Sequence, residues 1–164
     1  MSEKLIDLAI QIVAAEENAR LIAESIKDKV QVEVTPTPSL PITSRVIRDT
    51  NVKIPDTLID LDGSGCIKEF VIKSSSVNYI LKVYVDNLEL YHNTYTWFEN
   101  ISQQVEEIDA FEDNGIYVLR LSNINFANGI KIAAEPIITA LEQQPITSKL
   151  DEIFCKYDIT VKSL

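Results

Sequence analysis

The chain is poor in the residue types that most often build catalytic and metal centres. Its 164 residues contain one histidine, His92, and two cysteines, Cys66 and Cys155. A zinc site needs four clustered cysteine or histidine ligands, which this composition does not offer. A serine hydrolase would need His92 as its base and a Gly-x-Ser-x-Gly turn for its nucleophile, and that motif is absent. We therefore expect no enzyme and no cofactor, and we interpret His92 as a surface or capping residue.

The two cysteines lie far apart in the sequence, each in an apolar segment with the character of a strand. We expect both to be buried free thiols. A Cys66–Cys155 disulfide is the alternative, because the two layers of a sandwich could bring the residues together. The cysteine count therefore leaves the redox compartment open.

Basic residues are also scarce, and no long apolar run is present. Lysine and arginine total 15 against 25 aspartate and glutamate residues, a net charge of −10. Such a surface repels a phosphate backbone, so no nucleic acid partner is expected. The longest apolar stretch near the N-terminus, 8–15, is far shorter than the roughly 20 residues that span a bilayer. Because the N-terminus also lacks the basic and small-residue features of a signal peptide, we expect no membrane span and assembly in the cytoplasm.

The first 29 residues carry the rhythm of an amphipathic helix. Their apolar residues recur at alternating spacings of three and four, which places one stripe along a helix. We predict that this stripe binds copies of the chain or another protein, whereas the alternative is that it packs on the chain's own domain. The stripe consists of Leu5, Leu8, Ile12, Ala15, Ala19, Ile22 and Ile26.

Residues 30–41 predict an extended linker. The segment contains Pro36, Pro38 and Pro41, and each proline fixes φ and removes an amide donor. A proline-rich stretch is a semi-rigid spacer. A spacer after the helix favours contact with a partner over folding back.

Residues 42–164 predict a single β-domain. Short runs with a period of two alternate with turn residues, a pattern typical of an antiparallel β-sandwich. We therefore expect a mainly β, jelly-roll-like sandwich with an N-terminal α-helix and one inserted helix. The predicted strands are Ser44–Arg48, Thr57–Asp62, Cys66–Ser74, Tyr79–Asp86, Leu88–Asn93, Gly115–Leu121, Gly129–Ala134 and Ile159–Lys162.

The inserted helix is predicted from Thr96 onward, where Phe98, Ile101, Val105 and Ile108 recur at helical spacing. Trp97 is expected to be its core anchor. The alternative is that Trp97 is exposed and forms a sugar-binding platform with Tyr91 and Tyr95. Three acidic residues near the end of this region are candidate calcium ligands, although their spacing is not that of an EF-hand and a solvated surface is expected. These are Asp109, Glu112 and Asp113.

The order of several motifs resembles structural proteins of tailed phages and archaeal viruses. The motifs are the Gly63-Ser64-Gly65 turn, the serine run 74–76, the segment LKVYVDN and the segment GIYVLRLSNINFANGIKIA. Asp86-Asn87 stands where that group usually has an Asp-Gly hairpin. The resemblance covers about residues 60–134 and transfers no active-site residues. Its closing strand is matched by Phe126, Gly129, Ile130 and Ile132.

These observations together favour a non-enzymatic structural protein of a virus particle, such as a minor capsid, collar or tail component. Its expected partners are further copies of itself and other virion proteins, and its expected location is the virion after assembly in the host cytoplasm. The alternative is a carbohydrate-binding or host-adhesion module. A third possibility is an enzyme whose site the sequence does not reveal.

Overall fold

The computed structural model of the protein describes residues 3–30, 40–138 and 149–160. The chain divides into two compact units, Met1–Ser39 and Leu40–Leu164. The first unit contains helix α1, Glu3–Val30, which agrees with the heptad pattern. Most of the predicted linker, 31–39, lies outside the described residues.

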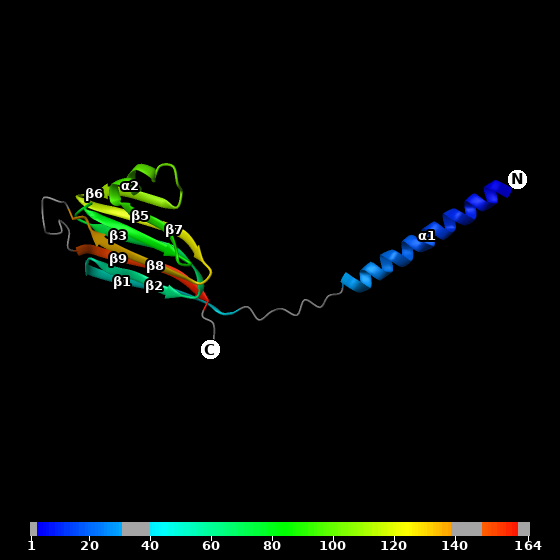
Figure 1. Ribbon diagram of the computed structural model, residues 1–164, viewed down its shortest axis with the longest axis horizontal. Coiled ribbons are helices and arrows are strands. Elements are labelled where there is room, and N and C mark those ends of the chain that lie inside the picture. The colour runs from blue at the N-terminus through cyan, green and yellow to red at the C-terminus, as the bar shows by residue number, and fades with distance from the viewer. Residues whose placement is uncertain (1–2, 31–39, 139–148, 161–164) are drawn as a thin grey trace. The chain divides into compact units, whose positions relative to one another are not determined.

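The second unit contains nine strands and a short helix among its described residues, and Figure 1 shows them as two stacked layers. In chain order these elements are β1 (Ile42–Lys53), β2 (Asp56–Asp62), β3 (Ser64–Ser74), β4 (Tyr79–Val85), β5 (Leu88–Thr94), α2 (Tyr95–Ile101), β6 (Ile108–Asp113), β7 (Ile116–Phe126), β8 (Gly129–Pro136) and β9 (Lys149–Thr160).

The strand pairing is nested, which confirms the predicted jelly roll. One sheet has the order β1-β9-β3-β7-β6 and the other has the order β2-β8-β4-β5. Strand β1 pairs with β9, β2 with β8, β3 with β7 and β4 with β5, always antiparallel. Successive nested pairs alternate between the two sheets, as in one long hairpin rolled into a sandwich. Strand β6 is an addition to this pattern at the edge of the five-stranded sheet.

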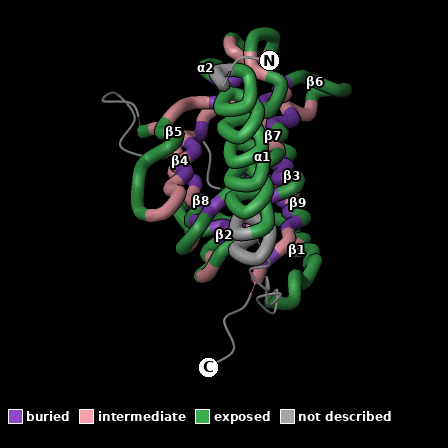
Figure 2. Tube along the Cα trace, turned by 90° about the vertical axis from the view of Figure 1, so that its right-hand side faces the viewer, coloured by how far each residue is buried: buried purple, intermediate pink, exposed green. Residues whose placement is uncertain are grey.

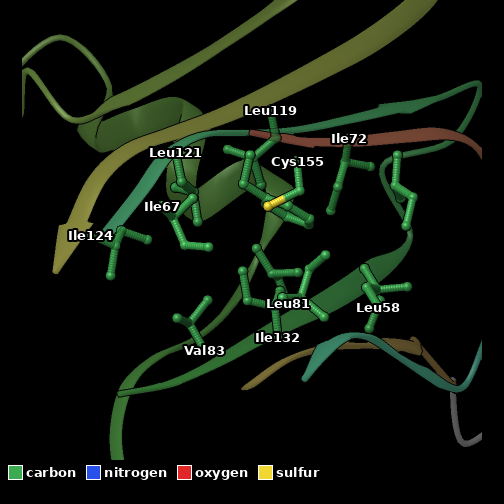
Figure 3. Packing of buried hydrophobic residues seen from close by; sticks show 14 of the residues in the cluster. Leu58, Ile67, Ile72, Leu81, Val83, Leu119, Leu121, Ile124, Ile132 and Cys155 are labelled. Atoms are coloured by element: carbon green, nitrogen blue, oxygen red, sulfur yellow. The ribbon is translucent and has the colours of Figure 1, made fainter. Parts of the chain in front are cut away.

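The core lies between the two sheets. Side chains from β3, β7 and β9 point toward those from β2, β4 and β8, as Figure 3 shows for Ile72, Leu119, Leu81 and Ile132. Strand β4 alternates cleanly, as its sequence predicted, with Tyr79, Leu81 and Val83 fully buried. Figure 2 shows buried residues alternating with intermediate ones along β4.

The predicted Asp86-Asn87 hairpin is confirmed, and strand β3 contains a bulge. Asp86 and Asn87 have φ angles of 52° and 66° and join β4 to β5, the left-handed pair that a tight hairpin of matching twist requires. Strand β3 shifts register against β9 between Ile67 and Glu69. This bulge lets Ile67 and Phe70, which an unbroken strand would place on opposite faces, both reach the core.

Two strands were not predicted correctly. Residues 108–113 form β6, which is not among the predicted strands, and helix α2 ends at Ile101, so Val105 and Ile108 are not on it. Strand β9 is longer than the predicted Ile159–Lys162 and lies between β1 and β3. Strand β6 pairs with the next strand, β7, across a short turn, whereas β9 pairs with strands far away in the chain. In both cases pairing satisfies the backbone, and the local pattern does not report it. Residues 161–162 of that prediction lie outside the described residues.

Gly65 lies where two strands and a ring leave no room for a side chain. An added Cβ would overlap the carbonyl oxygen of Asp158 and come within 2.7 Å of Phe126 Cζ. We expect Gly65→Ala to lower the free energy of unfolding by about 1–3 kcal/mol, because the packed core must shift. Chemical denaturation measures this loss. Ser64→Ala, at an exposed position in the same strand, is the control and should change stability by less than about 0.5 kcal/mol. Equal effects of the two substitutions would contradict the close contact.

Candidate functional site

The apolar surface of α1 is the most conspicuous candidate for a binding site. Leu5, Leu8, Ile12 and Ile22 of the predicted stripe each have more than half of their side-chain surface exposed. Ala15 and Ala19 are also exposed, and the side chain of Ile26 lies outside the described residues. Figure 2 shows this helix as exposed along its described length. Burying one large aliphatic side chain is worth roughly 1.5–3 kcal/mol, so this stripe favours association.

A second apolar face adjoins the stripe on the first half of α1. It consists of Ile6, Ala9, Ile10 and Val13, and the large members are exposed to the same degree as the stripe. A helix that is apolar on most of its circumference is usually buried on more than one side. The surface of α1 therefore fits a bundle with several helices better than a single shallow contact.

The side chains of the three candidate calcium ligands do not point toward a common site. Because side chains alternate along a strand, Asp109 and Asp113 lie on one face of β6 and Glu112 on the other. Asp109 is engaged with Arg120, at 3.6 Å between Oδ2 and Nη1. No group of three or more metal-binding side chains occurs among the described residues. The calcium hypothesis is therefore not supported at this position.

The aromatic platform that was the alternative interpretation of Tyr91, Tyr95 and Trp97 is not formed. Tyr95 is fully buried, whereas Trp97 has 38% of its surface exposed, so Trp97 is not the core anchor that was predicted. Phe98 takes that role and is fully buried between α2 and the sandwich. The rings of Tyr91 and Trp97 are tilted by 52°, whereas a sugar platform needs coplanar exposed rings. Phe98, and not Trp97, belongs to the set with helical spacing, so the periodicity itself favoured Phe98 as the anchor.

His92 lies on β5 with its Nδ1 atom 3.3 Å from Glu89 Oε2. Both side chains are more than two fifths exposed. This is a surface pair between residues of one strand. It agrees with the interpretation of His92 as a surface residue. The contact is with a carboxylate and not with a hydroxyl or thiol that a histidine could activate.

An open hollow of about 580 Å³ lies at the end of the sandwich where β2, β4 and β8 meet the turns. Asp86 is its organising residue, since its carboxylate accepts hydrogen bonds from the backbone N–H groups of Ala127, Asn128 and Gly129 at 2.6–3.1 Å. The bonds from Asn128 and Ala127 hold the pKa of Asp86 below its ordinary value. Asp86 thus joins the β4–β5 hairpin to the turn between β7 and β8.

Replacing Asp86 by asparagine should destabilise the protein in a pH-dependent way. Asparagine tolerates the left-handed backbone but carries no charge. A carboxylate with a lowered pKa stabilises the fold above about pH 4, and the contribution is lost as the pH falls through the pKa of the folded protein. The melting temperature of Asp86→Asn should therefore lie below that of the wild type at pH 7, and the gap should narrow toward about pH 2.

Thermal unfolding at several pH values measures this difference. Asp60→Asn is the matched control, because Asp60 is an exposed carboxylate that lines the same hollow. A similar pH-dependent loss of melting temperature in Asp60→Asn would mean that overall charge determines the stability difference. The hydrogen bonds that Asp86 accepts from the turn between β7 and β8 would then not be its cause.

Ion pairs surround a small apolar group on the outer face of the five-stranded sheet. Glu152 accepts from Arg48 at 2.7 Å and from Lys73 at 3.2 Å, and hydrogen bonding to Lys73 is the main cause of its lowered pKa. Arg120 lies 3.1 Å from Glu69. These groups line a hollow of about 420 Å³ with Val71, Phe111, Val118 and Phe154. The pairs are exposed, and each contributes little to stability.

The cysteines are free. Cys155 is buried in the core (Figure 3), and burial raises the pKa of its thiol to about 12. Cys66 is only half-buried, with its sulfur 3.5 Å from the carbonyl oxygen of Ile67. The prediction of free thiols is confirmed, and the prediction that both are buried is wrong for Cys66.

No protein-family model matches the chain, and no curated protein is similar to it. No described helix is both long enough and apolar enough to cross a membrane.

Proposed function

We propose that this protein is a non-enzymatic structural component of a virus particle. It assembles through its N-terminal helix and its β-sandwich, as a minor capsid, collar or tail protein. Its partners are further copies of itself and other virion proteins. It reaches the virion after assembly in the host cytoplasm.

The observation that carries the proposal is the exposed apolar surface of α1. Soluble monomers seldom leave so many large aliphatic residues in water, and surfaces of this kind mark interaction sites. The heptad spacing of Leu5, Leu8 and Ile12 suits packing between helices. Ala15 and Ala19 continue the stripe with small side chains that allow close approach.

The topology of the second unit supports the virion assignment. Jelly rolls, in which nested strand pairs form two stacked sheets, occur in viral capsid proteins and in lectins. The core is tightly packed and the outer face of the five-stranded sheet carries ion pairs. Both features suit a stable scaffold that holds the binding surface of α1. The motif resemblance over about residues 60–134 points in the same direction.

A glycan-binding or host-adhesion module is the second candidate. One observation favours it, namely the exposed indole of Trp97. A single ring can stack on a sugar, but the buried Tyr95 cannot extend the platform. A hit on a glycan array that Trp97→Ala abolishes would support this candidate over the first.

Mass spectrometry of purified particles tests the virion role. Particles would be isolated by density gradient from cultures that carry the gene, and the chain should co-purify at constant stoichiometry with the major structural proteins. A chain without residues 1–39 should be missing from those particles. Recovery of the intact chain only in the soluble fraction would reject the proposal.

A further inference from the structure

Strand β1 presents a long open edge of the five-stranded sheet. It spans the 12 residues Ile42–Lys53 and pairs with β9 along one side. Among the described residues, no strand pairs with its other side. An open edge exposes a row of unpaired N–H and C=O groups that can accept a further strand. No proline interrupts β1, and its one left-handed residue, Asn51, lies near its end.

The other three edges are poor candidates for pairing with a copy of themselves. Strand β6 has the sequence IDAFED and strand β2 the sequence DTLIDLD, so each carries three acidic residues and no basic one. Like charges opposite each other destabilise a strand pair. Strand β5 has seven residues, and its one acidic side chain, Glu89, already pairs with His92.

Strand β1 carries two opposite charges whose spacing makes the strand complementary to an antiparallel copy of itself. Arg45 and Asp49 lie on the same face of the strand as Ile47, which packs against the core. Both charged side chains are nevertheless exposed, so the second sheet does not cover them. Among the described residues Arg45 has no ion-pair partner, whereas Arg48, on the opposite face, is already paired with Glu152.

One antiparallel register satisfies both charges. A two-fold axis through Ile47 places Arg45 of each copy opposite Asp49 of the other. It also places Ile47 opposite Ile47, and it pairs the strand from Ile42 to Val52. Because opposite residues in this register lie on the same face, both sandwiches keep their cores on the same side of the joined sheet.

We propose that β1 is an interface with a second copy of this chain. The two strands pair antiparallel about Ile47 and join two five-stranded sheets into one. The inference deepens the proposed function, on which it rests for its biological role, because it identifies how the sandwich itself contributes to assembly.

The charges also select this register against its neighbours. A shift of the axis to Arg48 places two arginines opposite each other. An axis at Arg45 or at Asp49 likewise places identical charges opposite each other. An axis at Val46 places neither Arg45 nor Asp49 opposite a residue of opposite charge. Edge charges that block wrong pairings are a common protection against aggregation, and here only the register about Ile47 pairs both charges with a partner of opposite sign.

Charge exchange tests the interface in the full chain. The background is the variant with Leu8→Glu and Ile12→Glu, in which association through α1 is disrupted, so that failure of the helix hypothesis and failure of this inference are distinguishable. Sedimentation velocity over a concentration series should still show a dimer. Arg45→Asp alone and Asp49→Arg alone should each weaken it by about tenfold or more. The double variant should restore the wild-type affinity.

A cross-link tests the register. Cα atoms of directly opposed residues lie about 4.5–5.5 Å apart, within disulfide range. In a Cys66→Ser background, Ile47→Cys should therefore form a dimer under mild oxidation. Ser44→Cys is the control, because the two copies of residue 44 would lie roughly 20 Å apart.

The inference is overturned if the background variant is monomeric at all concentrations. It is also overturned if the dimer is indifferent to charge reversal, or if Ser44→Cys cross-links as well as Ile47→Cys. Loss of dimer with each single reversal and its recovery in the double variant would establish the pairing of Arg45 with Asp49.

Discussion

Replacing Leu8 and Ile12 by glutamate is expected to abolish association through α1. Both residues belong to the heptad stripe, and each has just over half of its surface exposed, 53% and 52%. In a bundle they would be buried, and burying an unpaired carboxylate is strongly unfavourable. The two changes also remove the two aliphatic contacts in the middle of the first half of the stripe. Light scattering should therefore show a lower oligomer mass at every concentration tested.

The matched control for this variant places the same charges on another face of the helix. Gln11→Glu and Asn18→Glu replace exposed polar residues that belong neither to the stripe nor to the second apolar face. This variant should retain a larger share of the wild-type association. If both double variants dissociate equally, the stripe is not the specific contact. If neither dissociates, α1 does not mediate assembly.

Replacing Phe98 by alanine is expected to cause the largest loss of stability. Its ring is fully buried and makes edge contacts with Tyr91 at 5.5 Å and with Trp97 at 5.1 Å between ring centroids. Removing a buried phenylalanine side chain costs about 3–5 kcal/mol, because the transfer free energy is lost and a cavity remains. Urea denaturation should show this as a lower midpoint with an unchanged slope.

Its neighbour in sequence provides the control. Trp97→Ala removes a larger ring, but one that is 38% exposed, so the expected loss is about 1 kcal/mol, mainly from its aromatic contacts. A greater loss from Trp97→Ala than from Phe98→Ala would contradict the assignment of Phe98 as the anchor. The same pair of variants separates a structural role of this region from glycan binding, which only Trp97→Ala should affect.

Helix α2 shows how a short segment is placed by its caps and its anchor. Thr94 accepts a hydrogen bond from the backbone N–H of Trp97 at its start. The helix has seven residues and buries Tyr95 and Phe98. Burial raises the pKa of Tyr95 to about 12, so this tyrosine is neutral across the physiological range. The insertion therefore closes one end of the core rather than presenting reactive groups.

Features encoded by neighbouring residues were predictable from the sequence alone. The heptad spacing predicted α1, the period of two predicted β4, and Asp86-Asn87 predicted a hairpin. In each case the cause lies within a few residues, because helix faces, strand faces and left-handed turns depend on local geometry. The jelly-roll class followed from the number and spacing of such segments.

The partners and surroundings of these elements were decided only by the tertiary structure. Strand β9 pairs with β1, more than 100 residues away in the chain at Arg48 and Glu152, and its sequence does not show that it lies inside a sheet. Strand β6 exists because β7 satisfies its backbone, and that pairing separates Glu112 from Asp109 and Asp113. Burial of Phe98 and exposure of Trp97 depend on how α2 meets the sandwich. Whether a charge such as that of Arg45 lacks a partner depends on which side chains folding brings near it, so the self-complementary edge of β1 could be recognised only in the folded chain.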